Sequence, residues 1–165
     1  FPEMIRVSVR NFFYNLEFPI RFVNCLLQAD FEGAGMELTR FVFNSTLGVA
    51  GFFDPATSQL HMKHYEEDLG QTLGRYGFGP GFYINIPFLG PSNLRDAIGR
   101  VGDGFLNPIN WFDDWAVVIG LQVGKALNNA SLTIGDYESL KEAALDPYVS
   151  IRDAYQQYRE KEIEE

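Results

Sequence analysis

The stretch 77–99, GFGPGFYINIPFLGPSNLRDAIG, lies near the middle of the chain and mixes helix-breaking residues with apolar ones. Its glycines and prolines interrupt regular structure on both sides of the apolar run 82–89. An exposed loop is normally polar, and a buried loop carries backbone groups that need partners. The stretch therefore predicts an irregular connection that is poorly suited to lie in open solvent.

Helical patterns precede this stretch. Apolar residues at helical spacing predict helices over 3–17, 19–30 and 33–44, the second with Pro19 in its first turn. Asp54 directly before Pro55 predicts another helix start, with Asp54 as the cap. A short helix is expected over 65–75. The N-terminal half is therefore expected to be helical.

Helical patterns also follow it. Ser92 or Asn93 is expected to cap a brief helix that Gly99 ends, and Pro108 to begin a longer helix over 108–129. Asp136 is expected to cap a further helix, and the last helix follows Pro147 and leads into a charged tail, 159–165. We find no repeat and no convincing strand alternation. The expected fold is all-α, a single domain over 1–165 with irregular connections rich in Gly and Pro.

The composition excludes some partners and leaves others open. The 165 residues carry a net charge of −9, which argues against nucleic acid and against polybasic attraction to anionic lipids. Aromatic residues make up 15% of the chain, 15 of them Phe; they suit either an aromatic core or rings that face a ligand, a membrane or a partner. Cys25 is the single cysteine, so the chain has no internal disulfide and no Cys-based metal site.

Three apolar segments, 41–53, 82–91 and 115–123, are each about half the roughly 20 residues that a membrane-spanning helix requires. Segments of this length either belong to a core or lie partway into one leaflet of a bilayer. The sequence pattern alone favours neither.

Candidate catalytic groups do not form a recognisable constellation. His61 and His64, followed by Glu66, Glu67 and Asp68, resemble a metal cluster, but the HExxH pattern is absent and a solvated polar segment is the simpler interpretation. Serines lack the nucleophile-elbow context, and paired acids such as Asp113–Asp114 suit helix starts. We expect no catalytic residue, no metal and no cofactor.

Charged residues placed among apolar or glycine-rich neighbours form a further set. Such charges are usually paired or capping when buried. We expect structural ion pairs or caps that hold the irregular segments. The set is Arg40, Asp54, Asp68, Arg95, Asp96, Asp103, Arg152 and Asp153.

Several long phrases resemble the MlaA (VacJ) family of outer-membrane lipoproteins. They are NFFYNLEFPIRFVNCLLQ, RFVFNSTLGVAGFFDPA, EEDLGQTLGRYGFGPGFYINIPFLGPSNLRDAIG and DPYVSIRDAYQQYR, in the family's order, from about Arg6 to Arg159. The family's secretion signal, lipidated Cys and first helical stretch are not among these residues, and Cys25 is not that Cys. Lipidation is implied by the resemblance alone.

The resemblance implies a disc-like or ring-like helical protein in the inner leaflet of the Gram-negative outer membrane. It implies association with trimeric porins and an amphipathic channel that returns misplaced phospholipids to a periplasmic lipid carrier. The half-length apolar segments are compatible with this location. We expect the lipid path to include Phe82, Tyr83, Ile84, Ile86, Phe88 and Leu89. The alternatives are a soluble metal-assisted hydrolase that uses His61 and His64, and a porin-binding scaffold without transport.

Overall fold

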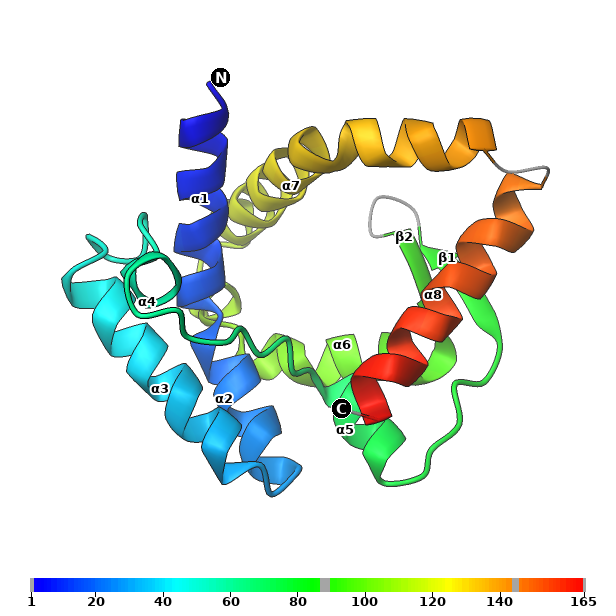
Figure 1. Cartoon of the computed structure of the whole chain (residues 1–165), viewed down its shortest axis with the longest axis horizontal. Coiled ribbons are helices and arrows are strands. Elements are labelled where there is room, and N and C mark those ends of the chain that lie inside the picture. The colour runs from blue at the N-terminus through cyan, green and yellow to red at the C-terminus, as the bar shows by residue number, and fades with distance from the viewer. Residues whose placement is uncertain (1, 87–89, 144–145, 165) are drawn as a thin grey trace.

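The computed structural model describes residues 2–86, 90–143 and 146–164 as a helical ring (Figure 1). Its elements, in chain order, are α1 (Glu3–Leu16), α2 (Phe18–Leu27), α3 (Phe31–Thr46), α4 (Pro55–Ser58), α5 (Leu69–Arg75), β1 (Tyr83–Ile86), β2 (Gly90–Asn93), α6 (Leu94–Leu106), the 3-10 helix η1 (Pro108–Trp111), α7 (Trp115–Ala143) and α8 (Pro147–Glu164). The expected helical class is confirmed.

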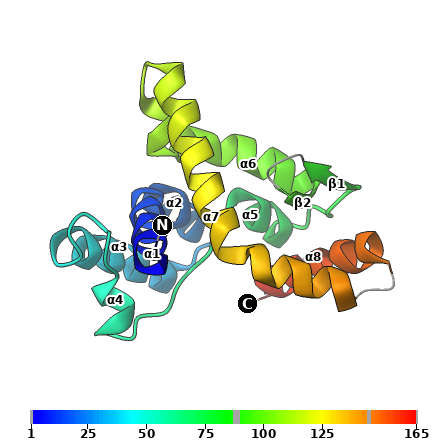
Figure 2. The same ribbon diagram turned by 90° about the horizontal axis from the view of Figure 1, so that it is seen from above.

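The ring is closed by contacts between helices that are distant in sequence. Arg6 of α1 donates a hydrogen bond to the Ser131 carbonyl of α7 at 2.6 Å, and Lys125 of α7 pairs with Glu17. From there α7 curves across to α8, which returns to pack on α5 and β2 (Figure 1). Seen from above, the end of α6, η1 and the start of α7 project to one side as an arm, residues 98–119 (Figure 2).

The central stretch contains a hairpin, and the expectation of no strand was wrong there. β1 pairs with β2 in antiparallel register, Tyr83 opposite Asn93 and Ile86 opposite Gly90. The strands have four residues each, too short for an alternation pattern to be recognised. Phe88 and Leu89 lie outside the described residues.

Helix starts were predicted well where the capping residue was recognised in the sequence and poorly elsewhere. Asp54 and Asn93 accept hydrogen bonds from the amides of Thr57 and Asp96, as expected of caps. The helix predicted from Tyr65 instead begins at Leu69, because Asp68 is its cap and accepts from the Gln71 amide.

Three further boundaries were wrong. Gly99 does not end α6 but lies within it. Its missing side chain lets α6 pack directly against the backbone of Gly70 on α5. Pro108 begins only η1, and α7 starts at Trp115, after Asp114, whose side chain accepts a hydrogen bond from the Ala116 amide. Asp136 does not cap a new helix, because α7 continues through it. The charged segment expected as a C-terminal tail forms, over 159–164, the last turns of α8.

The interior of the described ring is unusually polar. Among its largest fully buried side chains, most are charged or amide and hydroxyl groups, including Arg40, Glu37, Gln71 and Asn24. Large apolar side chains instead lie outside, with Phe105 of α6 78% exposed and Trp115 of α7 74% exposed. This is the reverse of the usual partition between core and surface.

Individual helices show the same inversion. α6 buries Arg95, Asp96 and Asp103 and exposes Ile98 and Val101. α3 buries Glu37, Arg40 and Asn44, while Phe31 and Val42 face outward. No described helix is both long and apolar enough to cross a bilayer.

Candidate functional site

Arg40 organises the side of the ring formed by α3, α4 and the segment 59–68. Its side chain is 2% exposed and pairs with Asp54 at 2.9 Å. It also donates to the Thr57 hydroxyl at 2.9 Å and to the Met62 carbonyl at 3.1 Å. Asp54 in turn caps α4. One guanidinium thus holds together two helices and an extended segment that has few internal hydrogen bonds.

A second layer extends this network toward α1 and α2. Arg21 pairs with Glu37 at 2.7 Å and lies 3.6 Å above the centre of the Tyr14 ring. The Tyr14 hydroxyl donates to the Tyr65 carbonyl at 3.1 Å. Burial alone would raise the pKa of Asp54, but hydrogen bonds from His64, Thr57 and Asn44 outweigh it and hold that pKa well below its usual range. Asp54 is therefore ionised, as its pairing with Arg40 requires.

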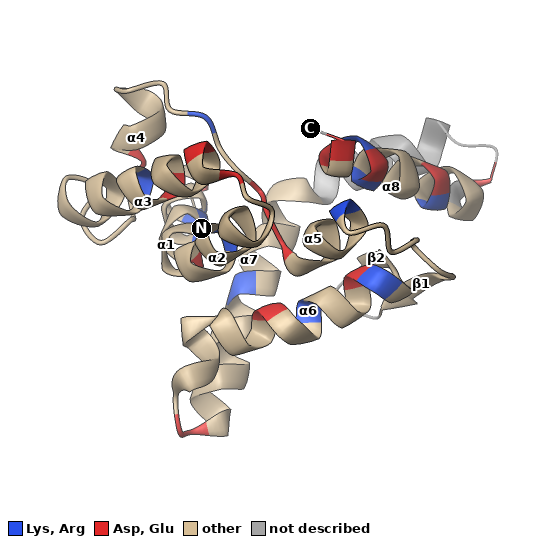
Figure 3. Ribbon diagram, turned by 90° about the horizontal axis from the view of Figure 1, so that it is seen from below, with Lys and Arg blue, Asp and Glu red and all other residues tan. Residues whose placement is uncertain are grey.

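Arg159 holds the other side of the ring and is the main site residue that sequence reasoning missed. It donates to both carboxylate oxygens of Asp68, at 2.8 and 2.9 Å, and to Asp96 at 2.9 Å. Tyr155 also donates to Asp96, at 2.7 Å. We call Arg159, Tyr155, Asp68 and Asp96 the α8 clasp, because it joins α8 to the starts of α5 and α6. Figure 3 shows acidic and basic residues interspersed there.

The sequence contains a pattern that could have identified Arg159 as a site residue. In RDAYQQYR, Tyr155 and Arg159 stand four residues apart and share one helix face. Burial disfavours the charged form of Arg159, but its hydrogen bonds to Asp68 and Asp96 outweigh this effect and raise its pKa. The residue was assigned to a charged C-terminal tail because it begins the strongly charged run REKEIEE, residues 159–165.

The remaining ionic candidates differ in what they contact. Arg95 pairs with its neighbour Asp96 at 3.0 Å, next to the α8 clasp. Asp103 is buried and accepts from the Asn24 amide and the Leu69 backbone. Arg152 and Asp153 pair only with each other among the described residues, at a partly exposed position. The structure therefore does not use that last pair to hold a distant segment.

The hairpin candidates that the structure describes belong to β1 or directly precede it, and the hairpin packs beside α8 (Figure 1). Tyr83 makes edge contacts with the rings of Tyr148 and Tyr155, with ring centroids 5.7 and 6.4 Å apart. Ile84 and Ile86 are half-buried, whereas Phe82 is exposed. The described part of the apolar run predicted as a lipid path, residues 82–86, therefore borders the α8 clasp.

The two histidines do not form a metal centre. His64 contacts Asp54 at 3.3 Å and the Thr57 hydroxyl at 2.8 Å, so it belongs to the Arg40 network. His61 is exposed, in a left-handed backbone conformation with φ 53°. Within residues 2–86, 90–143 and 146–164, no three His, Cys, Asp or Glu side chains are grouped to hold a metal ion.

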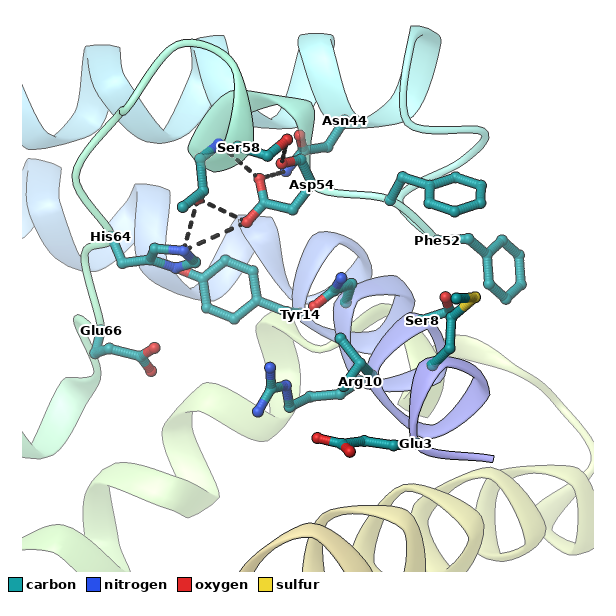
Figure 4. A pocket seen from close by; sticks show the side chains of 15 residues that line it. Glu3, Ser8, Arg10, Tyr14, Asn44, Phe52, Asp54, Ser58, His64 and Glu66 are labelled. Carbon is teal, nitrogen blue, oxygen red and sulfur yellow. Dashed lines mark hydrogen bonds and ion pairs between the residues drawn. The ribbon is translucent and has the colours of Figure 1, made fainter. Parts of the chain in front are cut away.

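A cavity of about 790 Å³ lies between α1 and the α4 region, beside the Arg40 network. Figure 4 shows Arg10, Glu3 and Glu66 extending into it, with Phe52 at one side and His64 and Asp54 at its back wall. The lining thus combines charged and apolar side chains. A second cavity of about 680 Å³, mostly apolar, lies between α1 and α7.

The fold and these sites define a helical ring with a polar interior and an apolar exterior. The chain belongs to the MlaA lipoprotein family, whose sequence model matches residues 1–162.

Relatives support this membership. The intermembrane phospholipid transport system lipoprotein MlaA of Escherichia coli K12 is 34% identical over 156 residues, covering 93% of this chain and 61% of the relative. The protein of the same name from Haemophilus influenzae is 32% identical over 165 residues, covering 94% and 63%. The chain thus spans somewhat under two thirds of the length of these curated relatives.

A solved structure from work on the structural basis for maintenance of bacterial outer membrane lipid asymmetry has the same fold. It superposes with a TM-score of 0.82 at 29% sequence identity. The match covers 99% of this chain and 82% of that chain.

Proposed function

We propose that this chain is the ring of a phospholipid transport protein of the Gram-negative outer membrane. It removes misplaced phospholipids from the outer leaflet through an amphipathic channel and passes them to a periplasmic carrier. The names of the Escherichia coli and Haemophilus influenzae relatives support phospholipid transport, and the solved structure supports a role in lipid asymmetry. Such transport moves an intact lipid and breaks no covalent bond.

The observation that carries the proposal is the inverted partition of side chains. Apolar area gains roughly 25 cal/mol per Å² when it leaves water, so a surface that exposes Phe31, Phe105 and Trp115 is costly in solvent and favourable in lipid. Because no described helix can cross a bilayer, this surface suits immersion in one leaflet. The inner, periplasm-facing leaflet of the outer membrane is the location implied by the family.

A lipid path must offer both polar and apolar surface, since a phospholipid has a charged head and two apolar tails. The α8 clasp and charged side chains next to it line a small cavity of about 230 Å³, which supplies polar surface. The hairpin residues Phe82, Tyr83, Ile84 and Ile86 supply apolar surface beside it. Trimeric porins and a soluble lipid carrier are the partners that we propose for the outer rim and the periplasmic face.

Outer-leaflet phospholipid in cells tests this path. Phe82→Ser together with Ile86→Ser places hydroxyls on the hairpin, and we expect outer-leaflet phospholipid to rise severalfold when the full-length variant replaces the wild type. Phe78→Ser makes the same exchange at another exposed position outside the hairpin and should leave asymmetry normal. Protein levels are measured in parallel.

Normal asymmetry in the hairpin variant at normal protein levels would remove the transport path proposed here. It would favour a scaffold that binds porin and moves no lipid.

A further inference from the structure

The cavity between α1 and α4 contains an arginine without a partner. Among the described residues, no hydrogen bond or ion pair engages the side chain of Arg10, although it lines this cavity. Arg21, Arg40, Arg95 and Arg159 are all paired with carboxylates inside the ring. Arg10 is thus a cation available to a ligand.

Two carboxylates line the same cavity and are likewise unpaired among the described residues. Figure 4 shows Glu3 and Glu66 on either side of Arg10 in the view, while Asp54 at the back wall is satisfied by Arg40. Glu66 is an exposed residue, but partial desolvation of its carboxyl raises its pKa, an effect that Arg21 and His64 partly oppose. A cation placed beside Glu66 would offset the cost of ionising it.

The unpaired charges therefore include both signs, with one more negative than positive. An anion alone would meet Arg10 but also the two carboxylates. A ligand that carries a phosphate and an ammonium group satisfies both signs, since phosphate is well matched to a guanidinium and ammonium to a carboxylate.

Apolar side chains complete the lining. Met4, Val7, Phe52 and Phe53 border the cavity, and the Phe52 ring stacks on Phe12 with centroids 4.9 Å apart. A volume of about 790 Å³ falls in the usual range of small-ligand pockets, which combine apolar walls with a few polar groups. The site therefore has room and surface for the glycerol and the first chain carbons of a lipid.

We propose that this cavity binds the headgroup of a zwitterionic phospholipid, with the phosphate on Arg10, the ammonium on Glu66, and the first acyl carbons on Phe52 and Phe53. The assignment rests on the proposed transport function and gives it a headgroup preference.

Calorimetric titration of the full-length protein in detergent tests the assignment. The probes are dihexanoyl phosphatidylethanolamine, dihexanoyl phosphatidylglycerol and inorganic phosphate. We expect wild type to bind the ethanolamine lipid more tightly than the glycerol lipid and to bind phosphate alone undetectably.

The variants separate the two charges. Arg10→Gln should weaken the binding of both lipids about tenfold, because both lipids carry the phosphate. Glu66→Gln should weaken the binding of the ethanolamine lipid only and so remove the preference for it over the glycerol lipid. Arg75→Gln and Glu160→Gln make the same exchanges at exposed residues that do not line this cavity and should change neither affinity.

Equal affinity of wild type for the two lipids would overturn the assignment, as would a Glu66→Gln variant that keeps the wild-type preference. Phosphate binding as tight as lipid binding would replace it with a free-phosphate site. If one of these three results is found and cells that carry the wild-type protein keep normal lipid asymmetry, the proposed transport function is unaffected. Absence of lipid binding by the wild-type protein, together with normal asymmetry in cells that lack it, would remove the two together.

Discussion

At the scale of single residues, Asp103 is a buried carboxylate without a cationic partner within hydrogen-bond distance among the described residues. It is 8% exposed and accepts hydrogen bonds from Asn24 at 2.8 Å and from the Leu69 amide at 3.0 Å. Burial raises its pKa from 3.8 to about 6, despite the opposing effect of these hydrogen bonds. The native protein therefore binds this proton more tightly than the unfolded chain does.

The free energy of unfolding should consequently fall as pH rises from about 4 to about 6, by on the order of 2 kcal/mol from this group. Below this window both states are protonated, and above it both are ionised. Asp103→Asn cannot titrate and should flatten this part of the curve, whereas Asp113→Asn, at an exposed position, should retain it. Urea unfolding at half-unit pH steps provides the measurement. An unchanged slope in Asp103→Asn would show that other groups cause it.

Helix caps were the residue-scale features most accessible from sequence. Asp54 before Pro55 has a local signal, so its cap could be predicted. Its pairing with Arg40 depends on how α3 and α4 meet, which the pattern does not specify. Arg159 was missed because charge density in its neighbourhood suggested solvent, while its actual partners lie 63 and 91 residues away.

At the scale of elements, α5 and α6 pack closely through glycine. A side chain at Gly99 would collide with the backbone of Gly70, and backbone cannot move aside as a flexible side chain can. At Gly104, five residues further along the same helix, an added Cβ would lie 3.5 Å from the Asn110 amide nitrogen, an ordinary contact.

Gly99→Ala should therefore destabilise the protein by about 1–3 kcal/mol through overpacking. Gly104→Ala should be neutral or stabilise it by up to about 1 kcal/mol, because alanine is the better helix former. Thermal unfolding of the two variants in the same detergent compares these effects. Similar melting temperatures would mean that α5 and α6 separate more readily than the contact suggests.

The same glycine explains why helix boundaries could be predicted only in part. Gly99 has the local signature of a helix end, yet packing against α5 keeps it within α6. The hairpin was missed for a related reason. Its two strands pair with each other and are held by α6 and α8, so their extended conformation reflects tertiary contacts more than local preference.

At the scale of the whole molecule, the arm formed by residues 98–119 carries both tryptophans of this chain. Trp111 donates to the Phe105 carbonyl at 3.0 Å, and Trp115 is largely exposed. Tryptophan favours the boundary between headgroups and acyl chains. The arm is thus a natural point of entry into lipid.

We expect Trp115 fluorescence to be quenched by lipids brominated on their acyl chains when the full-length protein is reconstituted in vesicles. Comparison with Trp115→Phe isolates this signal, and Trp111→Phe provides the matched control. Acrylamide in the aqueous phase should quench Trp115 only weakly. Strong acrylamide quenching without bromine quenching would place the arm in water.

The overall class of the fold and its family could be predicted from sequence, since both rest on long stretches of local pattern. The inversion of inside and outside could not. Each of α3 and α6 is amphipathic, but amphipathicity does not state whether the polar face turns toward the interior or toward solvent. That choice depends on the environment of the finished ring.

The α8 clasp also has a consequence for the order in which the chain assembles. Arg159 is synthesised 91 residues after Asp68 and 63 residues after Asp96. Until it arrives, both carboxylates lack this cation, and the preceding helices can form only an open arc. Contacts between such distant residues must overcome the entropy of the long intervening chain before they contribute stability. Closure of the ring is therefore a late event in folding, and the nascent protein passes through a form whose polar interior is still accessible from the side.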